Sequence, residues 1–164
     1  MTHDDHELIA RLIEHSPAGP DFDPARQTLT LLAALGELSG TLDAPGAGRW
    51  FLASYDLRTI LTVAAGLASC FDIQPHQGAA WPDGVQVGGD GASVAVHPPH
   101  HLLAELVVAA GWVAEWVRDT AGEDTAWQSA VPLTELIART WCLAGRLGVR
   151  DGLRALIEEQ LPVG

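Results

Sequence analysis

The residues best suited to chemistry lie in the segment His97-Pro98-Pro99-His100-His101. Histidine is the commonest metal ligand, and on a helix His101 and Glu105 share one face. This pair is half of the arrangement used by zinc proteases, but no second histidine follows at the required spacing. His100 and His101 point about 100° apart on a helix, so one ion does not readily reach both. We therefore predict no metal and no cofactor, and we keep His97, His101 and Glu105 as possible ligand-binding residues.

Several other kinds of site are excluded or weak. The chain has no lysine, which excludes Schiff-base catalysis on lysine and a phosphate-binding P-loop. No serine lies in a nucleophile-elbow motif, and the glycine-rich stretch 84–91 lacks the strand-then-helix context of a dinucleotide fold. Arg58 lies in the most apolar helical segment. We expect Arg58 to pair with an acid, either Asp56 or one from a neighbouring element, rather than with a ligand carboxylate, and we keep it as a possible ligand-binding residue. Catalytic residues, and whether the protein is an enzyme at all, remain unassigned.

Composition narrows the possible partners. The chain has 164 residues, 48% of them hydrophobic, and a net charge of −12. This acidity disfavours binding to nucleic acids and to anionic membranes, because both depend on cationic side chains. No run of about 18 apolar residues predicts a membrane span, and no signal-peptide pattern begins the chain, so we predict a cytoplasmic protein. The absence of lysine and asparagine is typical of a GC-rich genome, and we predict a bacterial source.

The elements that must position these residues are mostly helical. Apolar residues recur at helical spacing over residues 4–15, 24–42, 54–71, 102–120, 132–147 and 149–161. Between them, Val85-Gln86-Val87 and Val94-Ala95-Val96 alternate around a glycine-rich turn, which predicts a β-hairpin. The predicted fold is mainly α: a single domain over residues 1–164, built as a bundle of about five helices with one hairpin inserted around residues 84–97.

The segment 102–120 is the one around which we expect the fold to be organised. Its core face carries Leu106 among other apolar residues, and we predict that it packs against the segment 54–71 as the central pair. Val108 and Trp112 interrupt the opposite, polar stripe, and Trp116 lies at its margin. We predict that these three residues form an interface covered by another segment, such as the hairpin or the loop at Trp127, or by a second copy. We favour a homodimer.

Two classes of function follow. The first is a non-catalytic accessory or interaction protein that acts through the apolar, Trp-containing helix face on an otherwise acidic surface, with a second copy or another protein as partner. The second is a small-molecule-binding protein or enzyme with a pocket near the hairpin and the corner at His97–His101. We favour the first class, because enzymes of this length usually show some clustered polar chemistry. A deep pocket would favour the second class, and a flat apolar patch around Trp112 would favour the first.

Overall fold

A computed structural model describes residues 3–16, 21–43, 51–71, 98–119 and 126–162. These residues form the helices α1 (His3–Glu14), α2 (Pro24–Asp43), α3 (Ala53–Cys70), α5 (Pro99–Asp119), α6 (Ala126–Leu147) and α7 (Arg150–Gln160). The mainly α prediction is confirmed, and the described ranges contain no strand. The hairpin expected around residues 84–97 lies outside the described residues.

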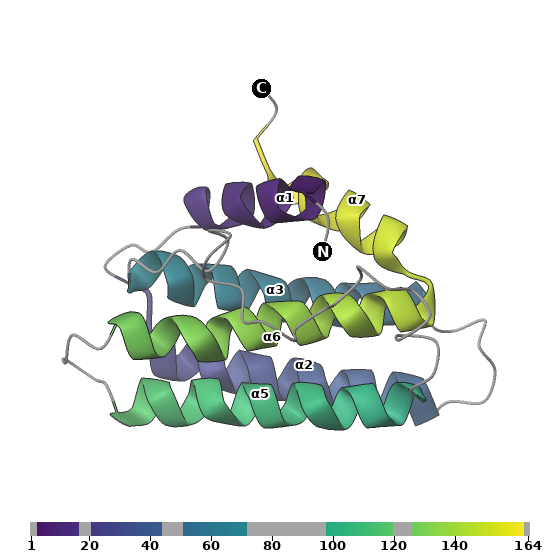
Figure 1. Ribbon diagram of the computed structural model, residues 1–164, viewed down its shortest axis with the longest axis horizontal. Helices are drawn as coiled ribbons and strands as arrows, with labels where there is room; N and C mark the ends of the chain where they lie inside the picture. The colour runs from purple at the N-terminus through teal and green to yellow at the C-terminus, as the bar shows by residue number, and fades with distance from the viewer. Residues whose placement is uncertain (1–2, 17–20, 44–50, 72–97, 120–125, 163–164) are drawn as a thin grey trace.

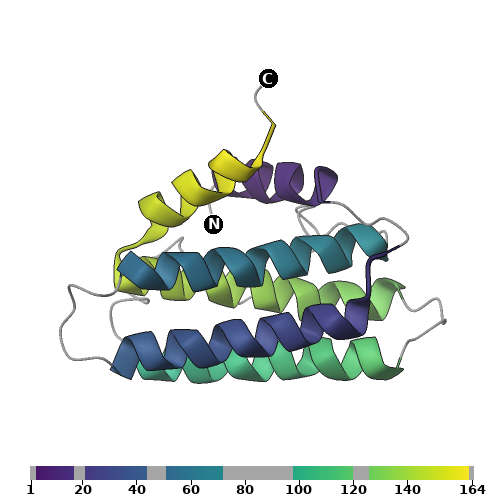
Figure 2. The ribbon, with the colours of Figure 1, turned by 180° about the vertical axis from the view of Figure 1, so that it is seen from behind.

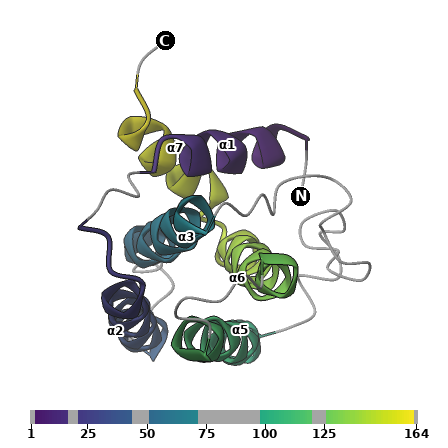
Figure 3. The same cartoon turned by 90° about the vertical axis from the view of Figure 1, so that its left-hand side faces the viewer.

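The four longest helices form a bundle with α1 and α7 packed on one side of it (Figure 1). Viewed along the helices, α3 and α6 make a middle layer, α2 and α5 lie below it, and α1 and α7 lie above it (Figure 3). The neighbours around the bundle are α2 with α3, α3 with α6, α6 with α5, and α5 with α2. From behind, α2 runs alongside α3 (Figure 2).

The prediction that the segments 54–71 and 102–120, now α3 and α5, pack directly against each other is wrong. These two helices lie at diagonal corners of the bundle, and each packs instead against α2 and α6. Both helices still contribute fully buried residues to one shared core, including Ile60 from α3 and Leu106 from α5. Their long apolar faces point toward the bundle axis, and such a pattern does not determine which helix is the neighbour.

Local sequence explains where the helices begin and end. The Asp23 carboxylate accepts hydrogen bonds from the backbone N–H groups of Ala25 (3.1 Å) and Arg26 (3.4 Å), and so caps α2 ahead of Pro24. The helix α6 ends at Leu147, and the next residue, Gly148, has a φ of 71°, in the left-handed region that glycine adopts without strain. The Val149 N–H then bonds back to the Ala144 carbonyl at 2.9 Å, which closes the helix end.

The upper layer is held by apolar packing and by one ion pair. From α1, Leu8, Ile9, Leu12 and Ile13 are buried, and from α7 Leu153 and Ile157 are fully buried. Asp5 of α1 is also buried, and it accepts a charge-assisted hydrogen bond from Arg154 of α7. A buried carboxylate is stable only when it is paired, so this contact ties the two short helices together.

Candidate functional site

The outer surface of α5 carries exposed apolar side chains in its middle. Val107 is 47% exposed, Val108 is 52% exposed and Trp112 is 50% exposed. Val108 and Trp112 are four residues apart and share one side of α5, next to α6. Val107 lies about 100° further around the helix, on the side where His100 contacts α2. Trp116 does not join that surface. It is only 8% exposed, and its ring packs edge-to-face against Phe71 with the centroids 4.8 Å apart.

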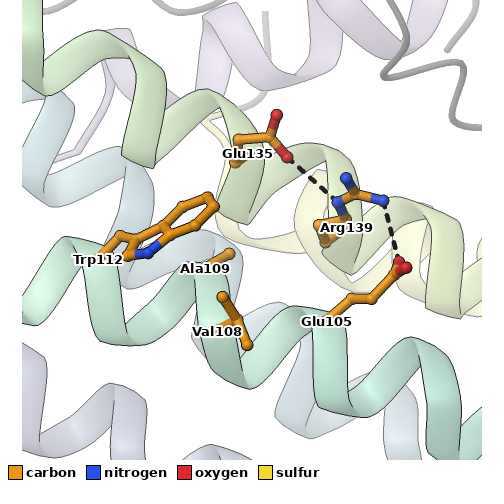
Figure 4. A pocket seen from close by; sticks show the side chains of 6 residues that line it. All are labelled: Glu105, Val108, Ala109, Trp112, Glu135 and Arg139. Carbon is orange, nitrogen blue, oxygen red and sulfur yellow. Dashed lines mark hydrogen bonds and ion pairs between the residues drawn. The ribbon is translucent and has the colours of Figure 1, made fainter.

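An open pocket of about 150 Å³ lies beside this surface, between α5 and α6. Trp112 stands at one side of the pocket, and the charged side chains of Arg139, Glu105 and Glu135 stand at the other (Figure 4). Val108 and Ala109 lie between these two sides. The pocket therefore has one apolar wall and one charged wall. It suits a chemical group with an apolar or aromatic body that can also contact a charged side chain.

The charged wall is an ordered network. Arg139 donates from Nη1 to Glu105 Oε2 at 2.9 Å and from Nε to Glu135 Oε2 at 3.1 Å. The second oxygen of Glu105 lies 3.4 Å from His101 Nε2, as the spacing of these two residues predicts. A guanidinium held by two carboxylates keeps one orientation, so Arg139 presents a fixed cationic surface to the pocket.

Sequence reasoning missed Arg139 and Glu135. Their only sequence signal is the spacing of four residues on a helix, which is common for surface ion pairs. Their link to Glu105 crosses from α6 to α5, over 34 positions of the chain. That contact follows from which helices are neighbours, and the apolar pattern did not contain that information.

The other candidate ligand-binding residues lie elsewhere. His97 is outside the described residues. The neighbouring His100 points to α2, where its Nε2 lies 2.8 Å from Asp43 Oδ1. Arg58 belongs to α3, at the diagonal corner of the bundle, and its guanidinium lies over the Tyr55 ring at 5.8 Å from the centroid. Within the described ranges no acid forms an ion pair with Arg58, so the expected pairing with Asp56 is not formed.

Asp56 instead interacts with Glu37 across the α2–α3 contact. Asp56 is 8% exposed, and burial is the main cause that raises its pKa from 3.8 to about 7. A hydrogen bond to Glu37 and the negative charge of Glu37 raise the pKa of Asp56 further. When Asp56 is protonated, its carboxyl group therefore donates the hydrogen bond to Glu37.

Other features bear on metals and membranes. In the part of the chain that the structure describes, no three histidine, cysteine or acidic side chains gather closely enough to hold a metal ion. None of the described helices is both long and apolar enough to cross a lipid bilayer. Both cysteines are free thiols; Cys142 is buried, whereas Cys70 is exposed.

Comparison with known proteins gives no further guide to the site. No family model, no curated protein and no solved structure is significantly similar to this chain.

Proposed function

We propose that this protein is a non-catalytic interaction protein of bacterial origin that assembles as a homodimer through the outer surface of α5. The observation that carries the proposal is the exposed apolar centre of that surface, formed by Val107, Val108 and Trp112. An exposed large aromatic side chain within an apolar cluster is typical of a protein interface, where tryptophan is over-represented.

The apolar surface continues onto the neighbouring helix. Leu29 and Leu32 of α2 are 66% and 48% exposed, and α2 packs directly beside α5. The contact between His100 and Asp43 joins the beginning of α5 to the end of α2, so the two helices are antiparallel. The surface available to a partner therefore spans two adjacent helices and is larger than a single exposed tryptophan.

Charge distribution favours a second copy as the partner. Two copies that each carry a net charge of −12 repel one another, except through a surface that is locally neutral. Beside the centre of the α5 surface, Arg139 pairs with both Glu105 and Glu135, so these three side chains together carry one net negative charge instead of two. Histidines lie at the beginning of α5, and Glu115 and Asp119 lie near its end. In an antiparallel twofold contact, Glu115 and Asp119 of one copy face the beginning of α5 in the other copy, so the acids at the two helix ends are kept apart.

Sedimentation equilibrium tests this proposal directly. The wild type should be dimeric, and Trp112→Glu should be monomeric with an unchanged helical circular dichroism spectrum. Tyr55→Glu is the matched control, because Tyr55 is an equally exposed aromatic residue (48%) on the diagonal helix α3, and this variant should remain dimeric. A wild type that is monomeric at the highest concentration reached, or a Tyr55→Glu variant that dissociates equally, would contradict the proposal.

The pocket between α5 and α6 supports a second candidate function, the binding of a small molecule. The supporting observation is its combination of the Trp112 wall with the Arg139 and Glu135 wall. A ligand in this pocket should quench tryptophan fluorescence in the wild type and should fail to do so in Trp112→Phe. Such quenching in a wild type that is monomeric would favour this function over the first.

A further inference from the structure

We infer that, in the proposed dimer, Trp112 of each copy fills the pocket between α5 and α6 of the other copy. The inference rests on the proposed function and adds the residue that each copy inserts and the site that receives it. The pocket then belongs to the interface and is not a separate small-molecule site.

The size of the pocket matches a single aromatic ring system. A cavity of about 150 Å³ in another protein is known to hold one benzene molecule, and the pocket here has a similar volume. The pocket opens to the surface, so part of a larger indole can extend beyond it. Among the residues of α5, Trp112 is the one exposed aromatic side chain, because Trp116 is buried.

A twofold axis brings Trp112 of each copy to the pocket of the other copy. Residues 108 and 112 lie one turn apart on the same side of α5. A twofold axis perpendicular to α5 and passing between these positions places Trp112 of the second copy opposite Val108. The same operation places Trp112 of the first copy opposite Val108 of the second. Because Val108 and Ala109 lie in the middle of the pocket, each indole arrives at the pocket of the other copy.

The walls of the pocket suit an incoming indole. Arg139 is held by Glu105 and Glu135 before any partner arrives, and a fixed guanidinium binds the face of an aromatic ring well. The resident Trp112 forms the opposite wall, so the two indoles of the dimer meet as an aromatic pair. The pocket thus offers the incoming ring a cation on one side and another aromatic ring on the other.

Fluorine NMR of protein labelled with fluorotryptophan tests the inference. The chain has six tryptophans, and the signal that is missing in Trp112→Phe identifies Trp112. As the wild type is concentrated from monomer to dimer, the Trp112 signal should move and lose its sensitivity to replacing H₂O by D₂O. The signal of the buried Trp116 should move much less.

Two variants locate the receiving pocket. Val108→Phe occupies the pocket with a side chain of the same copy, and the change is compatible with folding because Val108 is 52% exposed. This variant should keep the Trp112 signal solvent-sensitive at every concentration. Arg139→Gln should weaken dimerisation about tenfold through loss of the cation–ring contact. Arg11→Gln, which makes the same change of charge at an exposed residue of α1 on the opposite side of the bundle, should not.

The possible failures are distinguishable. A wild type that dimerises while its Trp112 signal stays sensitive to solvent would overturn the inference and leave the proposed function in place. A wild type that stays monomeric would overturn both. Normal dimers from Val108→Phe, with the Trp112 signal protected, would place the indole somewhere other than this pocket and would also overturn the inference.

Discussion

The two outer sides of the bundle differ in how their apolar surface is covered. On the side of α3 and α6, the short helices α1 and α7 bury their own apolar residues against the bundle, as Ile9 and Ile157 illustrate with 1% and 0% exposure. On the side of α2 and α5, Leu32 and Val107 remain 48% and 47% exposed. The first side is largely covered within the chain, although Tyr55 (48%) and Val131 (51%) are exposed near the beginnings of α3 and α6. The second carries the kind of surface that is completed by a partner.

The surroundings of the glycines in α3 differ in the same way from those in α2 and α5. In α3, a Cβ atom on Gly66 would lie 3.0 Å from the ring of Phe22, so packing within the chain explains the absence of a side chain there. In α2 and α5, a Cβ atom on Gly36, Gly40 or Gly111 would meet nothing within 4 Å. Contacts within the chain therefore do not require these three glycines. A closely approaching partner helix would make use of the space that they leave open.

The largest expected effect separates the two faces of a single helix. In a Trp112→Glu background, which the proposed function expects to be monomeric, Leu106→Ala should lower the free energy of unfolding by about 2–5 kcal/mol, because Leu106 is fully buried and its loss leaves a cavity. Val107→Ala, at the adjacent position on the outer surface, should change it by less than about 0.5 kcal/mol. Urea unfolding followed by circular dichroism measures both. Equal losses would mean that the outer surface of α5 is covered within the chain.

A somewhat smaller effect is expected from the ion pair of the covered side. Arg154→Ala should cost on the order of 3 kcal/mol, because it leaves the buried Asp5 carboxylate without its cation. Arg118→Ala is the control on the open side. It removes an ion pair with Asp119 in which both side chains are more than half exposed, so the melting temperature should stay close to that of the wild type. Thermal unfolding of the two variants compares the sides, and similar melting temperatures would contradict the distinction drawn between them.

The positions of the helices were largely predictable from sequence, because each has its own apolar periodicity. The two helix starts that were predicted wrongly, those of α5 and α6, both lie near prolines. The segment at 102–120 begins earlier, at Pro99, which suits the first turn of a helix. The segment at 132–147 begins at Ala126, and Pro132 lies inside α6. Proline at the start of an apolar pattern favours a helix start there, but it does not exclude a preceding turn of helix.

The candidate site was predictable only where its residues share one helix. The exposure of Val108 and Trp112, and the contact between His101 and Glu105, follow from the helical spacing within α5. Arg139 and Glu135 entered the site because α6 lies beside α5, and long apolar patterns do not specify which helices are neighbours. The interaction of Asp56 with Glu37 depends in the same way on the contact of α2 with α3.

The smallest effect concerns that acidic pair, which lies where the open side meets the middle layer. Because the pKa of Asp56 is about 7 in the folded protein and 3.8 as its ordinary value, the folded state holds a proton between these pH values that the unfolded state releases. Stability should therefore fall as pH rises from about 4 to about 7, and then level off. Asp56→Asn keeps a hydrogen-bond donor toward Glu37 and removes the titration.

The Asp56→Asn variant should lack this pH-dependent loss of stability and should be about 1–2 kcal/mol more stable than the wild type at pH 8. Glu37→Gln should give part of the same gain, because it removes the negative charge and leaves only burial to raise the pKa of Asp56. Urea unfolding at several pH values measures both variants against the wild type. If the wild type and Asp56→Asn lose stability in parallel between pH 4 and 7, the Asp56 carboxyl group ionises as freely in the folded protein as in the unfolded chain, and the contact with α2 does not raise its pKa.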